Sequence, residues 1–171
     1  MAGLKDEIAQ RQPFSSTEEE AVLNLMRTSD TLQRLFHLKI KEWGVTSTQY
    51  NVLRILRGAE PEGLPCAAIG ERMIAAEPDI TRLLRRLKNM KLIRQHRGRD
   101  DRRVVWTQIS AAGLELLTEM DPLVEKLPKE LLGHMSHSEL AEMIRLLELA
   151  RRRDPNERPL RCDRDGKEDL Q

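Results

Sequence analysis

Basic side chains are concentrated in one stretch of this sequence. Residues 64–110 hold 11 basic and 5 acidic residues, whereas residues 1–63 hold 8 and 9, and residues 111–171 hold 10 and 14. A local excess of lysine and arginine is the electrostatic footprint of a segment that faces a polyanion. Because no Gly-rich phosphate loop, nucleophile elbow or paired-carboxylate pattern occurs, we expect a binding protein and not an enzyme.

The first basic cluster lies on an expected helix that begins at Glu77-Pro78. Its apolar residues keep the helical period through Leu87, while basic residues cover the other side. With the short helix expected before it, this basic helix is typical of a helix-turn-helix, in which the second helix, called the recognition helix, turns its N-terminal residues toward base edges of DNA. The candidate major-groove contacts are therefore Glu77, Pro78, Asp79, Thr81, Arg82 and Arg86. The alternatives are a merely solvated basic face and acids that only complement the helix dipole.

The second cluster separates two apolar, strand-like runs at residues 92–93 and 104–109. A hairpin with a basic tip is predicted, and its candidate DNA contacts are Arg99, Asp101, Arg102 and Arg103. A narrow minor groove attracts an inserted arginine, and Asp101 could hold the Arg103 guanidinium in place through a charge-assisted hydrogen bond. The alternative is an exposed ion pair that contributes at most about 1 kcal/mol.

The remaining sequence predicts a mostly helical chain with one core and a tail. Three capping boxes mark helix starts, at Ser16 with Glu19, Thr46 with Gln49, and Ser136 with Glu139. The first long helix should stop at Gly44, and a short third helix should have Pro65 at its first position. Ser110 should cap the helix after the hairpin.

These motifs together resemble the winged helix of the MarR family of bacterial transcriptional regulators. The resemblance is carried by TRLLRRL at 81–87, LIR at 92–94, DDRR at 100–103 and ISAAG at 109–113, and it extends over about residues 15–150. Two positions depart from the family pattern. Lys91 stands where a glycine is usual before the first strand, and Gly98-Arg99 replaces the usual Asp-Pro of the wing.

The resemblance implies a fold that is mainly α with a small β-hairpin wing, in which helices from two subunits interlock. The apolar stripes at 22–40 and 114–147 suit that role. The implied organisation is an N-terminal arm or short helix at 1–14, a dimerisation and a support helix at 15–62, the winged helix-turn-helix at 63–110, C-terminal dimerisation helices at 111–152 and a disordered tail at 153–171. The family's wing pair falls on Asp101 and Arg103.

The function that follows from the resemblance is sequence-specific regulation of transcription, with repression expected, by a homodimer on double-stranded DNA. Two-fold symmetry predicts an inverted-repeat operator with half-sites about 10 bp apart. A winged-helix module that binds a protein and not DNA is the rival hypothesis. With no apolar run long enough to cross a membrane and no signal peptide, a cytoplasmic location is expected.

Small-molecule control is a further expectation, because many members of the family release DNA when an aromatic or phenolic compound binds. His37, Trp43, Tyr50 and Arg54 are the candidate effector residues here, against the simpler interpretation of core aromatics and ordinary surface residues. Cys66 is expected to be a small buried thiol and Cys162 an exposed one. His134 and His137 do not form a convincing metal site, so no cofactor is expected.

Overall fold

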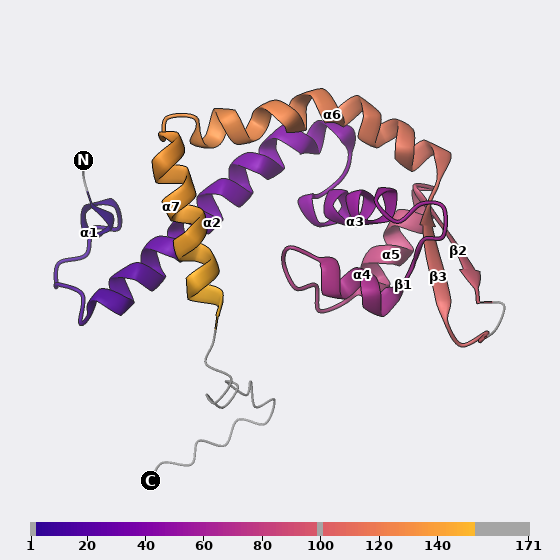
Figure 1. Ribbon diagram of the computed structural model, residues 1–171, viewed down its shortest axis with the longest axis horizontal. Coiled ribbons are helices and arrows are strands. Elements are labelled where there is room, and N and C mark those ends of the chain that lie inside the picture. Colours follow the sequence, from indigo (N-terminus) through magenta and orange to yellow (C-terminus); the bar gives the residue numbers. More distant parts are fainter. Residues whose placement is uncertain (1–2, 99–100, 153–171) are drawn as a thin grey trace, which may run out of the picture. The chain divides into compact units, whose positions relative to one another are not determined.

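The computed structural model describes residues 3–98 and 101–152. Its elements are α1 (Leu4–Glu7), α2 (Thr17–Ile40), η1 (Lys41–Trp43), α3 (Ser47–Arg57), β1 (Leu64–Pro65), α4 (Cys66–Arg72), α5 (Ile80–Asn89), β2 (Ile93–Arg97), β3 (Val105–Ile109), α6 (Ala111–Leu132) and α7 (His137–Arg151) (Figure 1). Residues 1–131 form one compact unit, and α7 belongs to a second. The predicted class, mainly α with a small β-hairpin wing, is confirmed.

The predicted helix starts are confirmed by their hydrogen bonds. The side chains of Ser16, Thr46 and Ser136 each accept a hydrogen bond from the backbone N–H three residues on. The reciprocal bond of the capping box forms at Thr46 and Ser136, but the Glu19 carboxylate accepts from Ser15 instead. Gly44 ends the η1 turn in the left-handed conformation, at φ 70°. The caps at Ser16, Thr46 and Ser136 satisfy backbone N–H groups that the first turn of a helix leaves free.

Several boundaries differ from the prediction. Pro65 precedes α4 as its N-cap and also belongs to β1, a two-residue strand with no signal of its own in the sequence. The recognition helix begins at Ile80 and not at Glu77-Pro78, because Asp79 caps it. The first wing strand extends from Ile93 to Arg97, well beyond its two apolar residues, since pairing with β3 supplies partners for its backbone.

One sheet joins the wing to the helices. Its strand order is β1-β3-β2, and both pairs are antiparallel, with Leu64 opposite Thr107 and Ile93 opposite Ile109. Figure 1 shows β2 and β3 continuing into a hairpin that extends beyond the helices. The sheet therefore fixes the wing at its base and leaves its tip open to a partner.

The core of this unit lies where α3, α4, α5, α6 and the sheet meet. Side chains from all five contribute, among them Leu53, Ile69, Leu84, Leu87 and Leu117, each no more than 2% exposed. Burial of side chains of this size stabilises the folded state by roughly 1.5–3 kcal/mol each. The core therefore fixes which faces of the helices remain available for binding.

Gly113 in the ISAAG motif has a packing role. Its N–H donates to the Ser110 hydroxyl, which in turn donates to the Lys91 carbonyl. A Cβ atom at this position would collide with the Leu92 carbonyl oxygen and the Ile109 side chain. Glycine is therefore required where the start of α6 packs against Leu92 and Ile109.

Lys91 shows what the departure from the family's glycine means for the backbone. Its φ is 62°, in the left-handed region that a lysine adopts only with strain. The Leu92 N–H donates to the Leu87 carbonyl, and the Lys91 N–H donates to the Lys88 carbonyl. These two bonds are the Schellman motif, in which the left-handed residue is usually glycine.

Replacing Lys91 with glycine should therefore stabilise the protein, by about 1 kcal/mol, because the left-handed conformation has no cost for glycine. Chemical denaturation would measure the change in the free energy of unfolding. The control is Lys88→Gly, inside α5, which should lower stability by about 1 kcal/mol. A loss of stability in both variants would contradict this account of Lys91.

Candidate nucleic-acid interface

The core determines which side chains of α5 face outward. Leu83, Leu84 and Leu87 are buried. Ile80 is partly buried, and the other positions of the helix, which include Thr81, Arg82, Arg85, Arg86 and Lys88, are exposed. The helix therefore carries a row of cations on the side away from its leucines, as the sequence pattern predicted.

The start of α5 is held by acidic side chains. The Asp79 carboxylate accepts a hydrogen bond of 2.9 Å from the Arg82 N–H, and the Asp79 N–H donates to Glu77. Of the predicted contact residues, Pro78, Asp79, Thr81, Arg82 and Arg86 are exposed and Glu77 is partly buried. Asp79 and Glu77 thus both accept hydrogen bonds from the backbone at the start of the helix. This role is closer to the alternative in which the two acids serve the helix itself and not a base.

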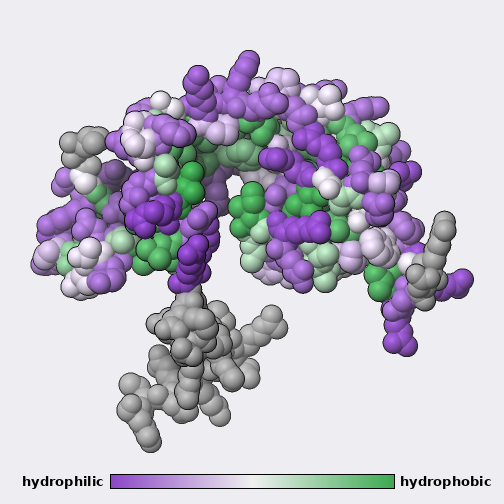
Figure 2. All heavy atoms as spheres, viewed as in Figure 1, coloured by the Kyte–Doolittle hydropathy of each residue, from purple (hydrophilic) through white to green (hydrophobic). Residues whose placement is uncertain are grey.

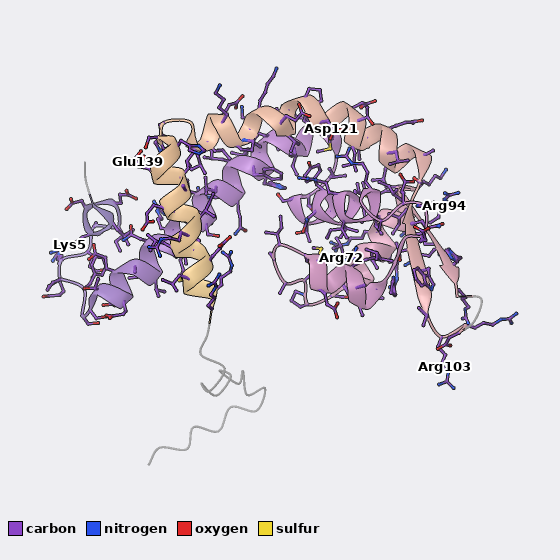
Figure 3. All side chains as sticks on the ribbon, in the orientation of Figure 1. Lys5, Arg72, Arg94, Arg103, Asp121 and Glu139 are labelled. Atoms are coloured by element: carbon purple, nitrogen blue, oxygen red, sulfur yellow. The ribbon has the colours of Figure 1, made fainter. Side chains whose placement is uncertain are left out.

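The wing presents its basic residues at the tip of the hairpin. Asp101, Arg102 and Arg103 are all exposed, and Figure 3 shows Arg103 at the end of the hairpin, pointing away from the helices. Figure 2 shows the same tip as a hydrophilic projection. Arg99, the remaining predicted wing contact, lies outside the described residues.

The contact between Asp101 and Arg103 differs from the expected one. The Asp101 carboxylate accepts from the Arg103 backbone N–H at 2.8 Å, so it shapes the turn and does not hold the guanidinium. A carboxylate that bonds the backbone two residues on is a common turn device. The sequence could not separate the two arrangements, because both need the same pair of residues at the same spacing.

The exposed cations of α5 and of the wing tip have no carboxylate partners among residues 3–98 and 101–152. Ion pairs there involve Arg27, Arg34, Lys39, Arg57 and Arg145, all outside residues 64–110. The exposed cations of α5 and the wing are therefore not neutralised by the described part of the chain. We call this set, Arg82, Arg85, Arg86, Lys88, Arg102 and Arg103, the basic surface.

The candidate effector residues are divided between the core and the surface. Tyr50 is buried and packs against Phe36 with ring centroids 5.7 Å apart, and Trp43 is partly buried against the core. His37 and Arg54 are exposed. Burial raises the pKa of the Tyr50 phenol, and the charge of the nearby Arg54 opposes that shift. Of the four, Tyr50 and Arg54 thus lie close to each other, and Trp43 packs against the core to which Tyr50 belongs.

Beside Tyr50 lies an ion pair for which the sequence gave no signal. Arg57 of α3 donates to both carboxylate oxygens of Asp121 in α6, at 3.0 and 2.9 Å. Hydrogen bonding to Asp121 raises the pKa of Arg57. Because the two residues are 64 positions apart, their meeting depends on how α6 packs on α3, which no local pattern encodes.

The other candidate ligands considered from the sequence were His134, His137 and the two cysteines. Cys66 is a free thiol, partly buried against the core, while Cys162 lies outside the described residues. No group of three potential metal ligands is found in residues 3–98 and 101–152. In that same part of the chain, no helix has the length and apolar character needed to cross a membrane.

A helix pair followed by a basic hairpin defines a winged helix-turn-helix DNA-binding protein, and comparisons with known proteins agree. A family described as transcriptional regulator SarA/Rot matches residues 34–120. A MarR transcription factor from Planctomyces limnophilus is 39% identical, with a TM-score of 0.62 over 80% of this chain and 99% of that one.

Two further relatives extend the comparison. The transcriptional regulator HosA of Escherichia coli O157:H7 is 25% identical over 121 residues, which cover 68% of this chain and 88% of HosA. MarR from E. coli with operator DNA shares the fold, with 19% identity and a TM-score of 0.70 over 88% of this chain and 100% of MarR. The protein belongs to the MarR family of winged helix-turn-helix transcriptional regulators.

Substituting Asp121 with asparagine should lower the free energy of unfolding by about 1 kcal/mol, because it removes a partly shielded ion pair in which one guanidinium nitrogen donates to both carboxylate oxygens. The matched control is Glu130→Gln, which removes a more exposed pair between Lys39 and α6. That change should cost less than about 0.5 kcal/mol. Equal losses in the two variants would show that the Arg57–Asp121 geometry contributes nothing special.

Proposed function

We propose that this regulator binds an inverted-repeat operator as a homodimer, with α5 in the major groove and Arg103 of the wing in the adjacent minor groove. The observation that carries the proposal is the basic surface, whose exposed cations have no partner among the described residues. Unpaired cations bind phosphates and release the counterions condensed on DNA. A wing that binds a protein has no need of this charge.

The position of the predicted contacts supports a division of roles. Thr81 and Arg82 lie in the first turn of α5, the part of a recognition helix that reaches base edges. Arg86 follows one turn later on the same side and suits a phosphate or guanine. Asp101 stabilises the turn that carries Arg103. The wing arginine can therefore enter a narrow groove from a shaped loop.

A homodimer is supported by apolar side chains that the single chain leaves exposed. On α2, Val22, Leu25 and Met26 are 55%, 47% and 64% exposed, and on α7 Ile144 and Leu149 are 56% and 54% exposed. Figure 2 shows apolar residues reaching the surface of the molecule. Exposed apolar residues in such numbers on helices mark a protein interface. A second copy of the chain is the partner that two-fold operator symmetry requires.

Replacing Arg103 with alanine should weaken operator binding by roughly tenfold or more and reduce the salt dependence of the affinity, because one groove contact is lost. Gel shifts over the upstream intergenic region of the protein's own gene, at several salt concentrations, would measure both. Lys126→Ala, which removes one exposed cation from α6, should change neither. Unchanged affinity for Arg103→Ala would refute the proposed role of the wing, and no binding by the wild type at low salt would favour a protein partner.

Introducing a charge at Met26, as Met26→Glu, should dissociate the dimer, because it places a carboxylate within an apolar interface. Sedimentation or light scattering would measure the mass. Asn24→Glu is the matched control, since residues two positions apart lie on nearly opposite sides of a helix. A dimer that survives Met26→Glu but not Asn24→Glu would move the interface to the other face of α2.

Effector control remains part of the proposal at the Tyr50 and Arg54 pair. A guanidinium next to a buried aromatic ring suits a small aromatic acid, by a charge-assisted bond and stacking. Trp43 contributes to the core and His37 lies on the surface, so neither has a position that adds to this proposal.

A further inference from the structure

Ile74, between α4 and α5, has an unusual environment for a large apolar side chain. It is 90% exposed, more than any other large apolar residue in the described part of the chain. Ala75 and Ala76 next to it are also exposed. Single exposed apolar residues are common on protein surfaces, so exposure by itself assigns no role. The position and anchoring of this residue are what make it informative.

The loop that carries Ile74 is fixed at both ends. Met73 on one side and Ile80 on the other pack against the core. The Ile74 N–H donates to the Asn51 side chain on α3, at 3.0 Å. The backbone that presents Ile74 is therefore tied to the support helix, and the exposed side chain has a defined place beside the start of α5.

The chemistry of this loop differs from that of the basic surface next to it. Residues 73–76 contain no lysine, arginine, serine, threonine or asparagine, so none of these side chains can donate to a phosphate. The apolar group on the edges of the bases in the major groove is the thymine methyl. In a helix-turn-helix the N-terminal residues of the recognition helix contact base edges in this groove, and residues 73–76 belong to the turn that leads into α5.

From this placement we infer that Ile74 contacts a thymine methyl group in each operator half-site and so helps to determine the sequence that the protein selects. The inference rests on the proposed binding of DNA by α5. It adds an apolar contact to an interface whose other predicted contacts, apart from Pro78, are polar or charged. Because the Ile74 side chain is almost fully exposed, its removal should leave folding unchanged.

The test replaces thymine with deoxyuridine, which removes only the methyl group. Operators would first be selected from random duplexes with the wild-type protein, and each thymine of a half-site would then be replaced in turn. We expect one position at which the wild type loses about fourfold in affinity, the effect of one buried methyl group. Ile74→Ala should bind the unmodified operator more weakly and show no further loss at that position.

Met90→Ala is the matched control, since it shortens another exposed apolar side chain of the same module at the far end of α5. It should keep the wild-type response to deoxyuridine. The inference is overturned if the wild type is insensitive at every thymine, or if Ile74→Ala keeps the wild-type loss. Either result with salt-dependent binding intact would leave the proposed function standing, whereas failure of the wild type to select any duplex would refute that function itself.

Discussion

Burial of the leucine face of α5 is the constraint from which the binding surface follows. Leu83, Leu84 and Leu87 are fixed in the core by contacts with the other helices and the sheet. A helix with one side held in this way has no freedom to turn, so its cations must face outward. The sheet does the same for the wing, because β2 and β3 are anchored at Ile93 and Ile109 and their basic connection lies beyond the core.

One close backbone approach and one left-handed turn hold helix and sheet together around this surface. Gly113 lets α6 begin against the Leu92 carbonyl, and the left-handed Lys91 turns the chain from α5 into β2. The Ser110 hydroxyl bridges the two, since it donates to the Lys91 carbonyl and accepts from the Gly113 N–H. The orientation of the wing relative to α5 therefore depends on a small group of residues that do not touch DNA in the proposed complex.

The pair Arg57–Asp121 has a comparable position between the support helix and α6. It connects α3, the support helix, with α6, a long helix that the family resemblance assigns to the dimer interface. A movement of α6 against α3 would strain this contact, and Tyr50 lies beside it. An effector bound near Tyr50 and Arg54 would thus act where the DNA-reading module and the proposed dimer helices are joined.

Local patterns in the sequence determined the helix caps at Thr46 and Ser136, the amphipathic α5 and the basic hairpin, because these depend on residues only a few positions apart. The same patterns placed the start of α5 three residues too early, since the choice of Asp79 as the cap depends on where the core holds the helix. The tertiary structure alone decided the β1 pairing, the Arg57–Asp121 contact and the exposure of Ile74. The first two depend on segments brought together from distant parts of the chain, and the exposure of Ile74 means that no described segment covers it. A window of neighbouring residues contains no signal for either.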